Sequence, residues 1–270
     1  MRNFLKKKTA LAAVMLTAVM LMTSAVSHDN VLIANNFIVK KGEKLIMRYF
    51  VTWGFNVISE RPMEKSVKSL KITTENGTKD LMSHTKEGAI PFVSTEVDFN
   101  GLGLIEAEKD YSFISIENKG FKEYLEADHI ENITIDESKK EQTERYARFI
   151  KSLVQSGPVK NDDLYKKMVG HPYEIILLQN PYKLKKGDWF KAQIFIDGKP
   201  MVGKVIVARN RVGGELPTYQ LSRTDDKGIC SFKLDREGDW TLTTTHLFPS
   251  RDKSKSDWES YWASYTFGTK

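Results

Sequence analysis

Short segments rich in β-branched and aromatic residues recur along the sequence, and glycine-containing turn signals separate them. In the second half a turn signal occurs about every ten residues, a spacing typical of antiparallel sheets with tight connections. The segments are residues 173–178, 189–196, 202–209, 229–234, 240–246 and 261–267. This pattern predicts a β-sandwich in the second half of the chain.

The first half carries its own strand signals. Lys44–Trp53 consists largely of β-branched and aromatic residues, and residues 92–99 and 111–116 alternate between apolar and polar positions. The Asn76-Gly77 pair is typical of a tight hairpin turn, because both residues tolerate a left-handed backbone. We therefore predict an antiparallel β unit in the first half.

Two segments between these β regions have helical patterns. Residues 120–130 predict a short helix. A second helix is predicted over residues 136–155, and Gly157-Pro158 is the signal that ends it. In the second segment apolar side chains fall at i, i+3, i+4, i+7 and i+8, and these are Tyr146, Phe149, Ile150, Leu153 and Val154. This spacing predicts a helix over residues 136–155 that packs one face against a sheet.

The chain of 270 residues is long enough for two modest domains, each with a core of its own. We predict a mainly β protein with two β-sandwich-like domains and a short helical insert between them. Residues 28–158 form the N-terminal β domain with the insert, and residues 159–168 form a polar linker. Residues 169–270 form an immunoglobulin-like or transthyretin-like sandwich.

Residues 1–27 have the pattern of a secretory signal peptide. Basic residues within positions 2–8 precede the apolar run 10–22, and small residues follow it. This run of about 13 residues is shorter than the roughly 20 that span a bilayer. We therefore expect cleavage near Ser27 and His28, and a mature protein that is periplasmic or secreted and peripheral to a membrane rather than integral.

Charge and cysteine content narrow the classes of function. The formal net charge is +6, but residues 1–27 hold four basic residues and no acidic one, so about +2 remains on the mature chain. This small excess gives no support for a nucleic-acid partner.

Cys230 is the only cysteine, so no intramolecular disulfide can form. Polar and apolar residues alternate around it, and this pattern predicts a buried strand residue.

Several short motifs occur together in a fixed order. They are residues 118–125 (NKGFKEYL), 144–149, 180–182, 186–188, 198–200, 224–228, 238–240 and 257–264. With these motifs the chain resembles a family of exported β-rich proteins labelled as periplasmic components of cobalt- or nickel-type ABC uptake systems. The resemblance spans nearly the whole mature chain. It implies an exported β-rich fold, nickel or cobalt as ligand, and a membrane metal-uptake transporter as partner.

His28 is the first candidate metal ligand. Signal peptidase prefers small residues, and Ala25 with Ser27 place a cut just before His28. A mature chain that starts at His28 offers a terminal amine and an imidazole on one residue as metal ligands. A cut after Ala25 instead makes His28 the third residue of the mature chain, and a histidine in that position suits copper(II) and nickel(II). The alternative interpretation is a frayed terminus in which His28 binds nothing.

Three further residues are candidates to complete this metal site. His246 ends a predicted strand, where its imidazole could face a cluster of loops, and Glu259 follows later in the sequence. His129 has acidic neighbours. No two histidines have the close spacing of a zinc protease or of a preformed zinc site.

Trp258, Tyr261 and Trp262 lie close together near the C-terminus. They could form a platform on which a ligand stacks, but packing in the core at one end of the sandwich is the favoured interpretation.

The sequence contains no nucleophile elbow, phosphate-binding glycine loop or dinucleotide fingerprint, so we do not expect an enzyme. We expect a binding protein for a divalent transition metal (nickel, cobalt or copper) or a small complex of one, which works with a membrane transporter. A cell-envelope module that binds a protein or a glycan without metal is the first alternative. A copper oxygenase built on His28 and His246 is the second.

Overall fold

The computed structural model describes residues 29–158 and 162–270, which form three β-sheets, one α-helix and three short 3-10 helices. The predicted mainly β fold is confirmed. The predicted signal peptide and His28 lie outside the described residues. Within the two described ranges, no helix has the length and apolar content needed to cross a membrane.

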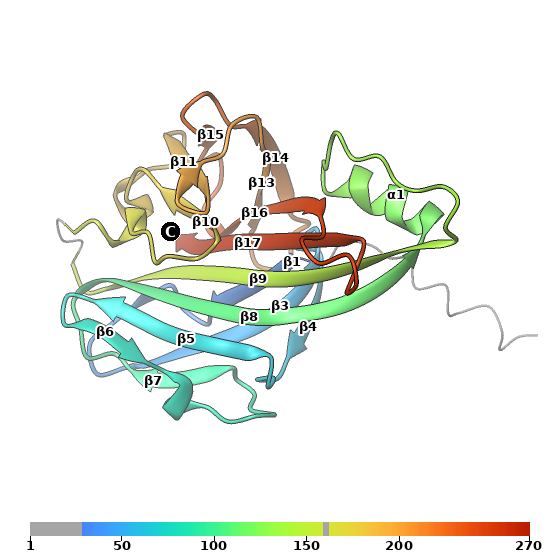
Figure 1. Ribbon diagram of the computed structural model, residues 1–270. Coiled ribbons are helices and arrows are strands. Elements are labelled where there is room, and N and C mark those ends of the chain that lie inside the picture. The colour runs from blue at the N-terminus through green and yellow to red at the C-terminus, as the bar shows by residue number, and fades with distance from the viewer. Residues whose placement is uncertain (1–28, 159–161) are drawn as a thin grey trace, which may run out of the picture.

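A nine-stranded central sheet runs through the molecule (Figure 1). In spatial order its strands are β14 (Thr218–Arg223), β13 (Val205–Arg211), β16 (Gly238–Pro249), β17 (Trp258–Thr269), β9 (Glu141–Ser156), β8 (Gly101–Glu117), β5 (Val67–Thr74) and β6 (Gly77–Asp80), and β2 (Ile38–Val39) pairs with the end of β9. β9 and β17 pair in parallel, with Ala147 opposite Tyr261. This pairing joins the two halves of the chain in one sheet, across the predicted boundary at residues 159–168.

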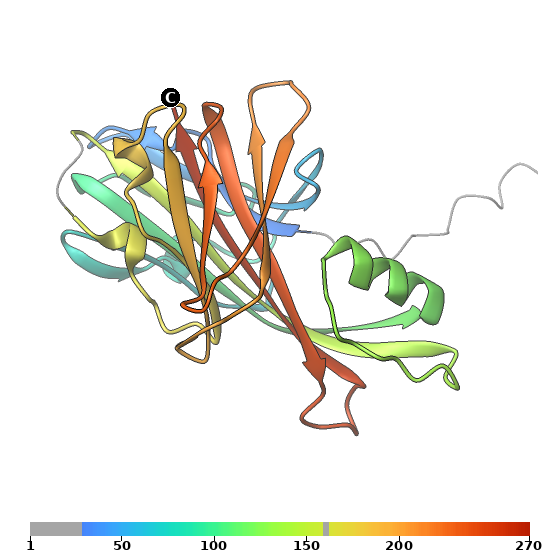
Figure 2. The same ribbon diagram turned by 90° about the horizontal axis from the view of Figure 1, so that it is seen from above.

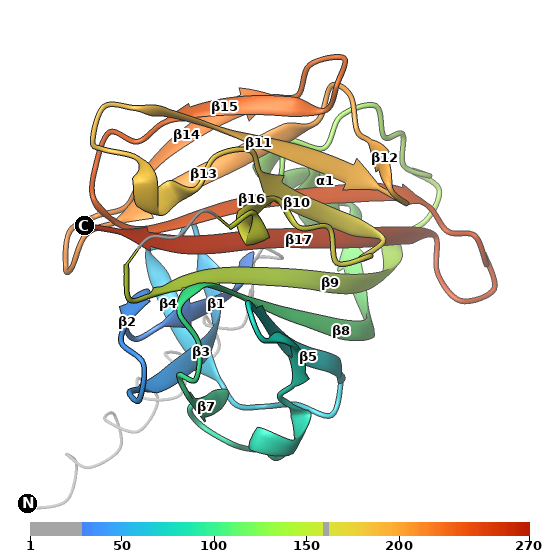
Figure 3. The ribbon, with the colours of Figure 1, turned by 90° about the vertical axis from the view of Figure 1, so that its left-hand side faces the viewer.

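Two smaller sheets cover the two faces of the central sheet, so three layers are stacked (Figure 3). The N-terminal outer sheet contains β1 (Asp29–Ala34), β3 (Lys44–Trp53), β4 (Val57–Arg61) and β7 (Val93–Glu96). The C-terminal outer sheet contains β10 (Tyr173–Leu177), β11 (Trp189–Ile196), β12 (Lys199–Pro200) and β15 (Ile229–Lys233). The 3-10 helices are η1 (Met82–His84), η2 (Leu164–Lys166) and η3 (Pro181–Lys183).

The predicted helix over residues 136–155 is wrong, because most of this segment forms β9 in the middle of the central sheet. Phe149 and Leu153 pack in the C-terminal core, whereas Ile150 and Val154 pack in the N-terminal core. A strand that is buried on both faces carries apolar residues in succession, and periodicity alone does not separate such a run from a helix. The predicted stripe is therefore divided between two cores.

Predictions that rested on local signals are confirmed. β3 covers the predicted Lys44–Trp53, and β5 and β6 form the hairpin around Asn76-Gly77. Cys230 lies on β15 and is 2% exposed, so it is the buried strand residue that the alternation predicts. β14 has no counterpart among the predicted strands.

The helix α1 (Asn118–Ala127) overlaps the predicted helical segment 120–130 but begins two residues earlier, and it lies beyond the main body of the sandwich (Figure 2). Phe121 packs against Trp258, with ring centroids 6.0 Å apart, and Tyr124 stacks on Trp262 at 5.8 Å. Tyr261 packs instead in the C-terminal core. Core packing of these β17 aromatic residues is therefore confirmed. Trp258 and Trp262 pack in the cluster around α1, whereas Tyr261 packs in the C-terminal core.

Candidate functional site

A cavity of about 190 Å³ lies where the loop after α1 meets the central sheet beside β13 and β16. Its walls are residues 129–132, residues 201–205, Arg223, His246 and Leu247. β13 begins at Val205, whereas β16 continues to Pro249, so the last residues of β16 extend past the start of β13. The loop after α1 covers the part of β16 that extends beyond β13. We call the resulting space the histidine cavity.

His129 occupies the position after α1 that most often holds glycine. Its backbone is left-handed (φ 52°), its N–H donates to the carbonyl of Glu126 (3.1 Å), and the Ile130 N–H donates to the carbonyl of Leu125 (2.8 Å). These two bonds form a Schellman motif, in which a residue with a side chain is strained by roughly 1–2 kcal/mol. Because such strain concentrates at functional sites, the His129 side chain is a candidate for function.

His246 enters the cavity from β16. Its ring packs against Tyr173, with centroids 6.0 Å apart, and against Phe248 at 5.2 Å. Burial lowers the pKa of His246 to about 4, and the positive charge of Lys204 contributes to the shift. Burial also lowers the pKa of His129, which disfavours the charged form of its imidazole. A neutral imidazole nitrogen is the form that binds a metal.

Lys204 also lines the histidine cavity, and only 9% of this residue is exposed. Burial lowers the pKa of its amine to about 8, which leaves most molecules protonated at neutral pH. Arg223 on the cavity wall pairs with Glu131 through two hydrogen bonds of 2.9 and 2.6 Å. This ion pair fastens the loop after α1 to β14.

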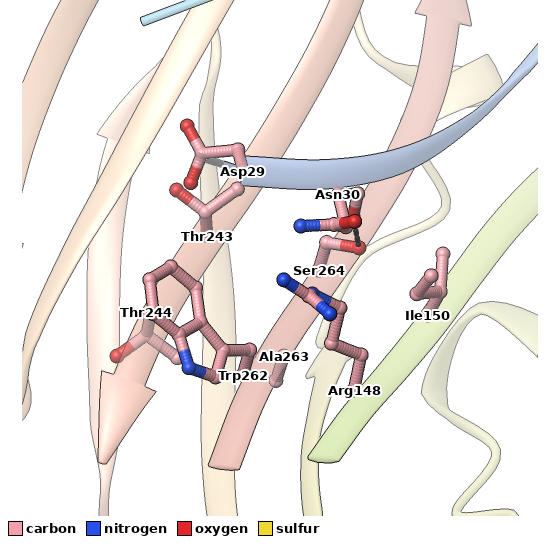
Figure 4. A pocket seen from close by; sticks show the side chains of 9 residues that line it. All are labelled: Asp29, Asn30, Arg148, Ile150, Thr243, Thr244, Trp262, Ala263 and Ser264. Carbon is pink, nitrogen blue, oxygen red and sulfur yellow. Dashed lines mark hydrogen bonds between the residues drawn. The ribbon is translucent and has the colours of Figure 1, made fainter. Parts of the chain in front are cut away.

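The described chain begins at Asp29, the residue after the predicted ligand His28. Arg209 Nη1 donates to Asp29 Oδ2 and to Thr243 Oγ1, both at 2.8 Å, so β1 starts against the face of β16 that carries Thr243. Figure 4 shows Asp29 beside Thr243 at the edge of a small pocket of about 10 Å³. A pocket of this size holds about one water molecule.

The end of α1 reaches the same face of β16. Thr245 Oγ1 donates to Asp128 Oδ2 (2.7 Å), and Thr245 is two residues along the strand from Thr243. Side chains two residues apart lie on one face of a strand, about 7 Å apart. Asp128, the residue before His129, is therefore anchored on β16, and Asp29, the residue after His28, is held near it through Arg209.

Glu259 does not line the histidine cavity. It is 0% exposed, and its Oε1 accepts hydrogen bonds from Arg145 Nη2 (2.9 Å) and from the backbone N–H of Arg251 (2.7 Å). In residues 29–158 and 162–270, no group of three or more His, Cys, Asp and Glu side chains is arranged to hold a metal ion. The structure thus brings His129 and His246 to one cavity and leaves Glu259 in a separate ion pair.

Lys204 and Arg223 are cavity residues that the sequence analysis does not identify. The chain contains 41 lysines and arginines, so a single basic residue carries no signal by itself. The one local signal is the position of Lys204 inside the apolar segment 202–209, where a lysine is unusual because burial of its charge is unfavourable.

A family model described as a domain of unknown function (DUF4198) matches residues 25–247. No curated protein matches the chain. Among solved structures, a tetra-tandem repeat in the extending region of a large adhesion protein is 10% identical with a TM-score of 0.21, and the match covers 89% of this chain. The chain spans 49% of the length of that structure.

A marsupial T cell receptor is 8% identical with a TM-score of 0.22, and the match covers 88% of this chain and 73% of the receptor chain. Three N-terminal domains of the bacteriophage RB49 Hoc capsid protein are 9% identical with a TM-score of 0.21, covering 89% of this chain and 97% of the other. TM-scores this low do not support a conclusion about fold or function.

Proposed function

The chain belongs to the DUF4198 family, a domain of unknown function, and we propose that it is an exported binding protein for a divalent transition metal or its complex. Nickel, cobalt and copper are the candidate metals, and assistance of metal uptake is the proposed role. The single observation that carries this proposal is that His129 and His246, two predicted ligands from distant parts of the chain, line one cavity.

The protonation state of the two histidines supports the proposal. Protons compete with metals for imidazole nitrogen, and this competition disappears where burial keeps the ring neutral. The lowered pKa values of His129 and His246 weaken this competition and favour binding of a borderline metal such as nickel or copper.

We propose His28 as a third ligand. Its neighbour Asp29 is held by Arg209, which also donates to Thr243. Asp128, the neighbour of His129, accepts from Thr245 on the same face of β16. This arrangement favours His129 over His246 as the immediate partner of the mature terminus. After cleavage before His28, the terminal amine would add a nitrogen ligand beside the imidazole.

Export and a transporter partner complete the proposal. The pattern of residues 1–27 supports export and cleavage, and the resemblance to metal-uptake components supports a membrane metal-uptake transporter as partner. A binding protein in this role presents the metal to the transporter and needs no catalytic group of its own.

Calorimetric titration of nickel, cobalt and copper into the mature protein that starts at His28 tests the proposal. His129→Gly is the most informative variant, because glycine relieves the left-handed backbone and the fold should stay as stable or gain about 1 kcal/mol. His246→Phe keeps an aromatic ring between Tyr173 and Phe248. We expect each variant to lose about 10–1000-fold in metal affinity.

His84→Ala is the matched control, since His84 is an exposed histidine on η1. Its affinity should equal that of the parent protein. Parent affinities weaker than about 10 μM for all three metals, or an unchanged affinity in both His129→Gly and His246→Phe, would remove the basis for the proposal.

A further inference from the structure

Lys204 is a charged group of the histidine cavity that has no hydrogen-bonded partner for its amine in residues 29–158 and 162–270. Among the described residues its Nζ atom makes no hydrogen bond and no ion pair, although the residue is only 9% exposed. The carboxylates of Asp128 and Glu131 act on it through space. The amine lines the cavity, where a ligand can supply the acceptor that the described residues do not.

Arg223 does not share this property. Its guanidinium donates two hydrogen bonds to Glu131 and a third to the carbonyl of Gly203 (2.7 Å), so its charge is balanced within the protein. The cavity therefore presents the ammonium group of Lys204, which has no hydrogen-bonded partner among the described residues, together with the imidazoles of His129 and His246.

This combination does not suit a bare divalent cation. A metal ion held by His129 and His246 would share the cavity with the Lys204 ammonium group, and like charges in a partly buried site repel each other strongly. A divalent metal bound to a chelator with three carboxylates removes this conflict, because the complex has a net charge of about −1 and a carboxylate of the chelator accepts hydrogen bonds from the ammonium group.

The size of the cavity agrees with a chelated metal. Its volume of about 190 Å³ is more than ten times the roughly 10–15 Å³ of such space that one water molecule needs. A single ion would leave most of this space to water, whereas a metal with a small organic chelator would fill it.

We infer that the histidine cavity binds its metal as an anionic one-to-one complex with a small tricarboxylate. His129 and His246 occupy coordination positions that the chelator leaves open, and Lys204 pairs with a carboxylate of the chelator. This inference rests on the proposed function and names the form in which the metal is bound.

Calorimetry with three titrants tests the inference: nickel chloride alone, citrate alone, and a preformed one-to-one nickel–citrate complex. The proteins are the mature parent chain and its Lys204→Met variant, which keeps the volume of the side chain and removes its charge. Lys199→Met on β12 is the matched control, because Lys199 is exposed.

The parent protein should bind nickel–citrate more tightly than nickel alone, by about tenfold or more. Lys204→Met should bind the complex about tenfold more weakly than the parent does, and bind nickel alone equally well or more tightly, because a repulsive charge is gone. A variant that had lost structure would bind nickel and nickel–citrate more weakly alike. Weaker binding of the complex together with unchanged or tighter binding of nickel therefore identifies the charge of Lys204 as the cause. Lys199→Met should behave as the parent.

Three results overturn the inference and leave the proposed function in place. They are a parent protein that prefers nickel alone, a Lys204→Met variant with an unchanged preference for the complex, and citrate that binds as tightly without nickel as with it. If neither nickel nor nickel–citrate binds the parent protein, the proposed function itself fails.

Discussion

Lys151 on β9 and Glu174 on β10 form an ion pair in which each side chain is 1% exposed. The pair connects the central sheet to the C-terminal outer sheet. Lys151 Nζ also donates to the carbonyls of Lys167 and Ile175, both at 3.1 Å, and Glu174 accepts from the backbone N–H groups of Val169 (3.0 Å) and Gly170 (3.2 Å). Both charges are therefore balanced and hydrogen-bonded inside the fold.

Replacement of Lys151 by methionine should strongly destabilise the protein. The variant Lys151→Met leaves the Glu174 carboxylate buried without its cation, and breaking a buried pair in this way costs about 3–5 kcal/mol. Urea unfolding of the mature chain measures the free energy of unfolding. The control is Lys167→Met, the same chemical change at an exposed side chain, which should stay within about 0.5 kcal/mol of the parent. Equal stabilities of the two variants would contradict the prediction.

Gly103 on β8 should not accept a side chain. A Cβ atom there would lie 2.6 Å from Phe99 Cζ and 3.1 Å from Val154 Cγ2, inside the N-terminal core. Gly103→Ala should therefore lower the free energy of unfolding by about 1–3 kcal/mol through overpacking. Gly214→Ala provides the comparison, since nothing lies within 4 Å of a Cβ atom at that position. The prediction fails if both variants unfold at the same urea concentration.

Glu144 on β9 should make the stability fall as the pH rises. The residue is 2% exposed and accepts a hydrogen bond from Tyr124 (3.4 Å) and another from Ser260. Burial raises the pKa of its carboxyl from 4.5 to about 7. Between these two values the folded chain keeps the proton and the unfolded chain releases it, so a rising pH favours unfolding.

The Glu144→Gln variant isolates this effect, because it has no carboxyl proton at the same position. The free energy of unfolding of the variant, relative to the parent, should increase by roughly 3 kcal/mol between about pH 4.5 and pH 7.5. Urea titrations at several pH values measure the difference, and contributions of other groups cancel in it. A difference that does not vary with pH would show that Glu144 titrates alike in both states.

The imidazole of His246 should stay neutral well below the usual range of histidine. Burial lowers its pKa to about 4, so its ring resonances should not shift between about pH 8 and pH 5.5. Proton NMR of the metal-free protein measures this, with the resonances assigned through the His246→Phe variant. A midpoint near the ordinary value of about 6.5 would mean that the ring is not held in the histidine cavity as described.

Some of the fold could be predicted because its signals are local. The strand Lys44–Trp53 is rich in residues that favour extended backbone, and Asn76-Gly77 tolerates the left-handed conformation that a tight turn needs, as Gly77 shows with φ 104°. Neither feature depends on residues far away in the sequence. β9 could not be recognised in this way, because Phe149 and Ile150 face different cores and only the stacking of three sheets makes both positions buried.

The candidate site could be predicted only in part. His129 and His246 were identifiable as metal-binding residue types, but nothing in the sequence places them together, and Glu259 is of an equally suitable type yet pairs with Arg145. Lys204 could not be recognised, since its role depends on the absence of a carboxylate partner among the described residues, and this is a property of the folded chain.

The sequence by itself determined the β class, the hairpin and the short helix α1, because propensity, turn chemistry and helix ends act over a few residues. Only the tertiary structure decided that β9 and β17 lie side by side, and that the loop after α1 covers the end of β16. The physical reason is that strand pairing is selected by how side chains fill two cores at once, and this packing involves residues that the sequence separates widely.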